Sequence, residues 1–312
     1  MKSFLARRFI SSVLSLVGAT FLVFAISQAA EDPLNLYAKP GGYGMSPEQR
    51  EALRIKLGLD KHVTIQYALW LGRAMRGDLG NSIFDELPVR DKIENRIGAT
   101  LKLGVFSWAF ATILGIPLGI LSAVKRATLM DYFGRGFALF GSAIPNFWLA
   151  IVLILLFSVQ LGWLPSSTLG DGFISIPHLI LPVFVLGTAT AAGYLRITRS
   201  AMLEILDSEF VKLARAKGVS DTTVVWKHAF RNALIPPLTV SAVLMASFIT
   251  GSLITESVFA ISGLGSLAIQ SVNNNDFPLL AGITLVFTAV WVTVNFLSDV
   301  AYVIVDPRIR LS

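Results

Sequence analysis

One long polar stretch, residues 207–236, interrupts the apolar C-terminal half of the chain, and we call it the polar segment. It carries five Lys or Arg residues and lies between two apolar runs that are each long enough to cross a membrane. Its residue types offer charge and hydrogen bonding but no convergent set of side chains for covalent catalysis. A basic segment between two membrane spans needs a surface to dock against, so the chemistry that it indicates is recognition.

The spacing in the polar segment predicts two short helices joined by a turn. Good helix formers run from Glu209 to Lys217 and end at Gly218, which suits a helix stop. Ser220 is expected to cap a second helix beginning at Asp221, where a carboxylate favours the positive end of the helix dipole.

The second predicted helix is amphipathic. Its apolar stripe and its basic face both follow a spacing of four residues: Val225 with Ala229, Trp226 with Phe230, and Lys227 with Arg231. This periodicity leaves two interpretations open. The helix lies on anionic lipid, or it inserts into the groove of a partner protein.

Motifs of the common enzyme classes are missing. No Gly-Lys dipeptide occurs, so the chain has no P-loop. There is no cysteine, and the three histidines (His62, His178 and His228) are far apart in sequence, so we expect no metal site. Gly263 and Gly265 open a Gly-x-Gly-x-x-Ala match, but it follows an apolar span rather than a strand, and a tight turn is the expected role.

The composition indicates a bilayer environment. The chain of 312 residues is 54% hydrophobic and only 15% charged, whereas soluble domains carry roughly a quarter of charged residues. Its net charge of +6 comes from residues that flank apolar runs, so we interpret it as a topology signal and not as a nucleic-acid surface.

Six segments are long and apolar enough to cross the membrane as helices of about 20 residues. A secretory signal is the alternative for the first, because Ser27-Gln28-Ala29 resembles a cleavage site, but the run exceeds the roughly 7–15 residues of a signal core. The predicted spans are Phe9–Ala30, Leu101–Val124, a stretch within Phe133–Gln160, His178–Leu195, Ala233–Phe259 and Phe277–Val305.

Lys and Arg residues gather before the first span, at 125–135, in 196–232 and in the tail, whereas 161–177 and 260–277 have none. This asymmetry predicts that both termini are cytoplasmic. The expected organisation is 1–30 (N-terminus and first span), 31–100 (external cap), 101–305 (five-helix core with a cytoplasmic loop at 196–232) and 306–312 (tail). Within the cap, Ser46-Pro47-Glu48-Gln49 predicts a helix start, Gly58 its stop, and Gln66–Met75 a second helix.

The cytoplasmic loop then shows a resemblance. Glu209, Ala214-Arg-Ala-Lys-Gly218 and His228-x2-Arg231-Asn232-Ala233 resemble the signature of permease subunits of binding-protein-dependent ABC importers, closest to the dipeptide/oligopeptide/nickel branch. The resemblance covers nearly the whole chain. Further matches are Leu57-Gly-Leu-Asp60, Arg76-Gly-Asp-Leu-Gly80, Gly115-Ile-Pro117-Leu-Gly119, Ile144-Pro145-Asn-Phe-Trp148, Leu161-Gly-Trp-Leu-Pro165, Glu256-Ser-Val-Phe259, Gly263-Leu-Gly265 and Asp306-Pro-Arg308.

The resemblance implies an all-α membrane protein of six transmembrane helices with the ABC type I importer permease fold. It implies that the loop is a coupling helix that docks in a cleft of an ATPase subunit, with Gly218 as the turn. The residues to which that role falls are Glu209, Ala214, Arg215, Ala216, Lys217, Gly218, His228, Arg231 and Asn232. For His228 the expected contribution is to brace the loop by hydrogen bonding.

The partners implied by the resemblance are a second permease subunit, two ATPase subunits and an external solute-binding protein. ATP and magnesium would be bound by the ATPase subunits, and this chain is expected to bind no cofactor and to be no enzyme. Di- or oligopeptides are the expected cargo, with oligosaccharide or chelated nickel as alternatives in the same branch. An ion-gradient-driven secondary transporter is the alternative of another class, although no internal repeat is evident.

The chain departs from the family pattern in two places. Lys212-Leu213-Ala214 stands where the general importer signature has Glu-Ala-Ala, and Glu31-Asp-Pro33, followed by the glycine-rich 39–44, stands where Gly-Asp-Pro is common.

Asp299 lies in the predicted sixth span, where an ionisable group is costly. It is either a gate that pairs with Arg196 or Arg199, which end the fourth span, or a carboxylate facing water at the interface. Asn295 shares its face at helical spacing.

Overall fold

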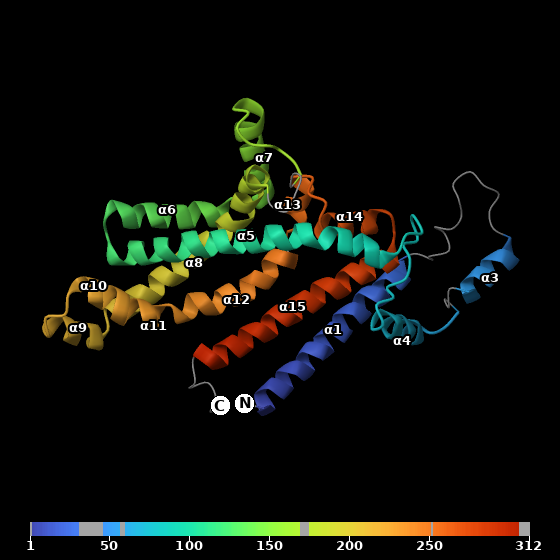
Figure 1. Ribbon diagram of the computed structural model, residues 1–312, viewed down its shortest axis with the longest axis horizontal. Coiled ribbons are helices and arrows are strands. Elements are labelled where there is room, and N and C mark those ends of the chain that lie inside the picture. The colour runs from blue at the N-terminus through green and yellow to red at the C-terminus, as the bar shows by residue number, and fades with distance from the viewer. Residues whose placement is uncertain (1, 31–45, 57–59, 169–174, 251, 306–312) are drawn as a thin grey trace. The chain divides into compact units, whose positions relative to one another are not determined.

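The computed structural model describes residues 2–30, 46–56, 60–168, 175–250 and 252–305, and this part of the chain is almost entirely helical. The described residues contain no strand beyond an isolated bridge between Asn81 and Pro88. The chain forms two compact units, one of residues 1–98 with 262–296 and one of residues 99–261 with 297–312. Figure 1 shows the elements of each unit.

The first unit contains α1 (Lys2–Ala30), α3 (Pro47–Lys56), α4 (Val63–Ala74), α14 (Leu264–Asn273) and most of α15 (Phe277–Val305). Its core is aromatic: Tyr67 and Trp70 are buried on α4, and Phe21 of α1 meets the Tyr67 ring edge-on at 5.2 Å. The Tyr67 hydroxyl also shares a hydrogen bond of 2.7 Å with Thr20 Oγ1. This polar end of the ring fixes α4 against α1, since a buried hydroxyl needs a partner.

A second joint in this unit connects residues 82–83 to the start of α15. Asp276 accepts hydrogen bonds from the hydroxyl of Ser82 and from the backbone N–H of Ile83, the latter at 3.1 Å. Nearby, Lys92 donates to Asp85. Hydrogen bonds to Asp276 and the contact of Lys92 with Asp85 therefore hold the irregular stretch between α4 and α5.

The second unit is built on α5 (Val89–Val124), α6 (Leu129–Ala143) and α8 (Ile176–Leu206), of which α5 starts in the first unit. Two glycines of α5 allow close packing on α8. A Cβ at Gly115 would lie 2.5 Å from the carbonyl oxygen of Ala191, and one at Gly119 would lie 2.6 Å from Thr198 Cβ. Small residues at a spacing of four are the usual means by which membrane helices approach closely.

The predicted third span is two helices. α6 ends at Ala143, and α7 (Asn146–Leu153) continues as the π-helix η1 (Ile154–Gln160), with a bend of 104° between the two. Proline disfavours the helical conformation of the preceding residue, and Ile144 before Pro145 is extended, with φ −84° and ψ 123°. Among the described residues, length and hydropathy give five helices that could each cross a membrane, or six spans when the bent pair counts as one.

The predicted sixth span, Phe277–Val305, matches α15. The fifth is α12 (Ile235–Thr250) followed by α13 (Leu253–Val258), and the cap helices Pro47–Lys56 and Val63–Ala74 lie where helices were expected. The fourth is longer than predicted, because α8 continues past Leu195 to Leu206 through turns that mix charged and apolar residues. Some motifs lie wholly or partly outside the described residues: those at 31–33, 39–44, 57–60 and 306–308, and the helix stop at Gly58.

Candidate functional site

The first arm of the polar segment is α9 (Glu209–Ala216), which follows α8 after a short break at Asp207 and Ser208. Two hydrogen bonds close α9: the N–H of Gly218 donates to Arg215 O at 2.9 Å and that of Val219 to Ala214 O at 3.2 Å. Gly218 has φ +79°. This pair of bonds with a left-handed glycine is the Schellman stop, so the turn predicted at Gly218 is present.

The second arm begins at Asp221, as predicted, with α10 (Asp221–Thr223). It continues through the π-helix η2 (Val224–Phe230) and α11 (Arg231–Ala233) into α12. Ser220 occupies the N-cap position, but its hydroxyl bonds to that of Thr223 at 2.9 Å and caps no backbone N–H. The π-helical turn widens the spacing of side chains, a deviation that often occurs at functional sites.

One face of both arms is buried in the second unit. Val211 of α9, Val224 of η2 and Ala229 are each fully covered, and η2 contacts both α8 and α9. The predicted apolar stripe is therefore divided: Val225 and Ala229 face inward, whereas Trp226 is 55% exposed. The inward face fixes the arms on the end of α8.

The outward face combines apolar and basic side chains. Phe210 is 44% exposed and Leu213 57%, and the Trp226 ring packs edge-on against Phe230 at 5.4 Å. Exposed apolar side chains within a basic surface are typical of a site that binds another protein. Two of the basic residues are paired inside the segment, Lys212 with Glu209 at 2.7 Å and Arg215 with Asp221 at 3.5 Å.

The predicted docking residues are distributed over both arms of this surface. His228 and Ala214 are half-buried, while the others are exposed: Glu209, Arg215, Ala216, Lys217, Gly218, Arg231 and Asn232. Within the described residues the His228 imidazole makes no hydrogen bond. The bond that braces this turn runs from the Asn232 amide to the His228 carbonyl oxygen at 2.8 Å.

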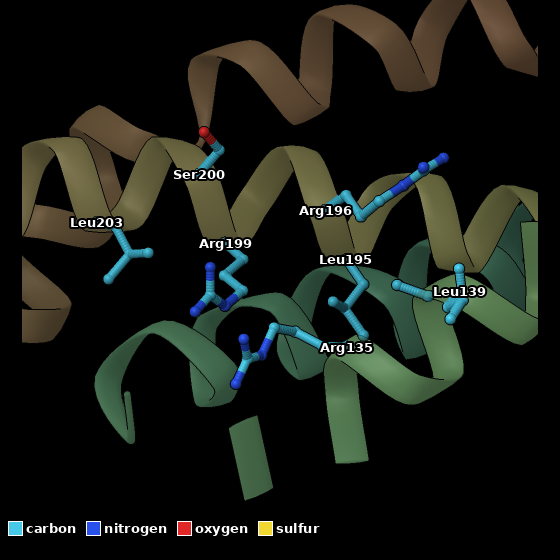
Figure 2. Close-up of a pocket in the computed structure, with 8 residues that line it drawn as sticks. Arg135, Leu139, Leu195, Arg196, Arg199, Ser200 and Leu203 are labelled. Carbon is cyan, nitrogen blue, oxygen red and sulfur yellow. The ribbon is translucent and has the colours of Figure 1, made fainter. Parts of the chain in front are cut away.

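A buried ion pair that sequence reasoning missed joins α6 to α8, and Figure 2 shows its Arg199 side chain on α8. Asp131, in the first turn of α6, is covered, and its carboxylate accepts two bonds from Arg199 of α8, at 2.8 and 3.0 Å. The hydroxyl of Ser122 and the N–H of Ala127 also donate to it, at 2.7 and 3.0 Å. In the sequence, the feature that could have indicated this pair is the single acid, Asp131, in the otherwise basic stretch 125–135.

Of the two residues suggested for a gate, only Asn295 has a described side chain. The Asn295 amide donates to the carbonyl of Trp291, one turn earlier in α15, at 2.8 Å. The side chain of Asp299 lies outside the described residues. The Arg199 guanidinium, one of its two suggested partners, is bonded to Asp131. Among the described residues, no three His, Cys, Asp or Glu side chains are grouped to hold a metal ion.

Comparison with known families gives two matches that together cover most of the chain. Residues 115–311 match the family described as binding-protein-dependent transport system inner membrane component. Residues 1–104 match the N-terminal part of the membrane component of such systems.

Individual proteins are similar over almost the full length. The oligopeptide transport system permease protein AppB of Bacillus subtilis (strain 168) is 40% identical, over 99% of this chain and 100% of its own. The dipeptide transport system permease protein DppB of Escherichia coli (strain K12) is 36% identical over 99% of each.

Two solved structures share the fold. The MetNI methionine ABC transporter, in an inward-facing conformation, aligns with a TM-score of 0.55 at 18% identity, over 69% of this chain and 96% of its own. An amino acid ABC transporter with histidines gives 0.53 at 17%, over 74% and 96%.

Proposed function

Because the chain belongs to the family of binding-protein-dependent transport system inner membrane components, we propose that it forms half of a translocation pathway and contacts a separate ATPase through its polar segment. The chain is a multi-pass permease component of a bacterial ABC importer and is not itself an enzyme. Membership of this family distinguishes it from an ion-gradient-driven transporter. The pathway alternates between two states whose populations are shifted by nucleotide bound to the partner.

The observation that carries the proposal is the two-sided build of the polar segment. Its inner face is anchored on α8 by covered residues such as Val211 and Ala229. Its outer face leaves Phe210, Leu213 and Trp226 exposed. A short helix that packs against its own chain on one side and exposes apolar and basic side chains on the other suits insertion into a groove of a partner.

The proposed assembly has two ATPase subunits, a second permease subunit and an external solute-binding protein. ATP and magnesium would be held by the ATPase subunits. Residues 31–100 would form an external cap, residues 101–305 the core with the loop 196–232 in the cytoplasm, and both termini, including the tail 306–312, would be cytoplasmic. The lack of Lys and Arg in 161–177 and 260–277 supports this orientation.

Di- or oligopeptides are the proposed cargo, and the names of the relatives AppB and DppB support this choice. Oligosaccharide and chelated nickel are the alternatives within the branch. Uptake of labelled peptide by cells that carry the assembly, in competition with each alternative solute, tests the cargo separately from the docking role.

Crosslinking tests the docking role directly. The chain has no cysteine, so Lys217→Cys beside the Gly218 turn gives a single attachment point in the intact assembly. We expect a bifunctional reagent to join it to a nucleotide-hydrolysing protein while import is active. Lys61→Cys, exposed in the first unit, is the matched control and should capture none. Active import without capture at position 217 would contradict the proposal.

A further inference from the structure

The short helix α4, which belongs to the external cap, packs on α1 inside the stretch of α1 that is suited to cross the membrane. That stretch runs from Arg7 to Ile26. The Tyr67 hydroxyl of α4 donates to the carbonyl oxygen of Val17 at 3.0 Å. The rings of Phe21 and Phe24 meet the Tyr67 ring edge-on at 5.2 and 5.8 Å. One side of α4 therefore reaches the middle of a membrane span.

The same side of α4 reaches equally far along α15. Tyr67 and Trp70 form one buried cluster with Ala281, and Leu285 packs against that cluster. Both of these α15 residues lie in a candidate span that begins at Phe277. At 1.5 Å per residue, Leu285 lies about 12 Å from that end of the span, whereas half of the hydrocarbon layer is about 15 Å thick. Contacts on two spans thus place the buried side of α4 at hydrocarbon depth.

The opposite side of α4 is apolar and open. Ile65 and Leu69, one turn apart, are each 51% exposed, and Ala68 between them is exposed as well. On α1 the side chains of Leu22 and Ile26 are 60% and 65% exposed, as expected of a span that faces lipid. Because α4 lies beside this part of α1, its open face is continuous with a surface that acyl chains cover.

Basic residues stand at both ends of α4 and identify the depth at which the helix lies. Lys61 precedes it, Arg73 is in its last turn and Arg76 follows it, and all three are exposed. Its 12 residues make a helix of about 18 Å. A helix with an apolar face and basic ends lies in the plane of the interface, where long basic side chains extend to the lipid headgroups. A protein groove over the same face would have to accommodate three cations as well.

We propose that α4 is an interfacial helix inserted in the outer leaflet, with Ile65 and Leu69 against acyl chains and its basic ends at the lipid phosphates. Residues 31–100 would then form a cap that is partly embedded in the membrane and not wholly in water. The choice of leaflet rests on the topology given under Proposed function. Insertion rests only on α1 and α15 as spans, and it is independent of the ATPase contact.

The test measures what surrounds position 69 in the purified full-length chain with its co-purifying partners. The chain has no cysteine, so Leu69→Cys carries a single nitroxide in nanodiscs of equal phosphatidylcholine and phosphatidylglycerol. Electron paramagnetic resonance compares its collisions with oxygen, which concentrates among acyl chains, and with a water-soluble nickel chelate. We expect oxygen collisions to exceed nickel collisions, as they should for Leu22→Cys on α1.

Ile55→Cys is the matched control, because Ile55 is also an exposed apolar residue (59%) on a cap helix, the charge-rich α3. There nickel collisions should exceed oxygen collisions. The same ratio at positions 55 and 69 would overturn the proposal, as would an excess of nickel collisions at 69. Few collisions with either reagent at 69 would show that a protein covers α4, and would overturn it too.

A second label at Ile65→Cys gives the depth. Its fluorescence should be quenched more by phosphatidylcholine with a doxyl group near the headgroup than by the lipid with the group near the end of the acyl chain. The reverse order would refute an interfacial position. If position 69 faces lipid while an impermeant reagent labels Lys61→Cys only after lysis, the outer leaflet is the wrong choice and only the topology fails. If position 69 faces water while position 217 still captures the ATPase, only the insertion of α4 fails.

Discussion

Asp131 is the residue on which three stretches of the second unit converge. It receives hydrogen bonds from Ser122 at the end of α5, from Ala127 in the connection and from Arg199 of α8. It also stands in the first turn of α6, where the helix dipole favours an anion. The position of α6 on α8 therefore depends on one carboxylate that the sequence did not single out.

Replacement of Asp131 by Asn should destabilise the protein by about 3 kcal/mol, the lower end for breaking a buried ion pair, because Arg199 is still 21% exposed. Thermal unfolding in detergent measures the loss. Glu94→Gln is the control, because its pair with Arg90 is exposed and such pairs contribute only about 0–1 kcal/mol. Equal shifts in the two variants would contradict the role of Asp131.

The carboxyl of Asp85 predicts how the stability of the protein changes with pH. Burial raises the pKa of its carboxyl, but hydrogen bonds from Lys92, Ser82 and the N–H of Leu87, with the charge of Lys92, outweigh burial and hold that pKa below its ordinary value of 3.8. The stabilisation is thus fully present above that value and is lost as the pH falls through the lowered pKa. The stability difference between the native chain and Asp85→Asn should be constant near neutral pH and shrink below about pH 4. A difference that grows on acidification would refute this account.

At the scale of elements, the contact between α5 and α8 depends on the absence of a side chain at Gly119. A Cβ there would also lie 2.8 Å from the carbonyl oxygen of Leu195. Gly119→Ala should therefore destabilise the protein by about 1–3 kcal/mol, as overpacking does. Gly136→Ala on α6, where nothing lies within 4 Å, should be neutral or stabilising by up to about 1 kcal/mol. Unfolding curves that rank the two variants in the opposite order would refute the close packing.

The turn between the two arms of the polar segment makes a prediction about transport. Gly218→Pro removes the N–H that bonds to Arg215 O, and its ring fixes φ near −65°, whereas the native φ is +79°. This variant, and charge reversal at Arg215 and Arg231, should abolish solute uptake while membrane insertion stays intact. Uptake in cells and the amount of protein in the membrane fraction measure the two effects. Normal uptake by these variants would show that the polar segment does not transmit the ATPase cycle.

Local signals predicted the elements where one physical effect decides the outcome. The bounds of α15 follow from a long, mostly apolar run, and the end of α9 follows from a glycine that can adopt positive φ. The continuation of α8 past Leu195 was missed, because Arg196, Arg199 and Glu204 interrupt the apolar run and the added turns are held by tertiary contacts such as that of Arg199 with Asp131. The bend at Pro145 was also missed, since a proline in a membrane helix is compatible with a straight span.

At the scale of the whole molecule, the proposed topology places the cap and the polar segment on opposite sides of the membrane. A membrane-impermeant thiol reagent should label Lys61→Cys in intact cells from which the outer barrier has been removed. Ser220→Cys, also at an exposed position, should be labelled only after lysis. Labelling of both cysteines before lysis, or of neither, would overturn the topology.

The continuous helix α8 has a mechanical consequence. Pro182 is the proline inside α8, and it leaves one backbone carbonyl of the helix without its usual partner. The helix continues for 24 residues beyond it, to Leu206. At 1.5 Å per residue, this part of the helix is about 36 Å long. A rotation of about 10° about its Pro182 end would therefore displace its Leu206 end by roughly 6 Å. In the proposed topology, a displacement of the Leu206 end by a partner would therefore be accompanied by a much smaller displacement of α8 near Pro182.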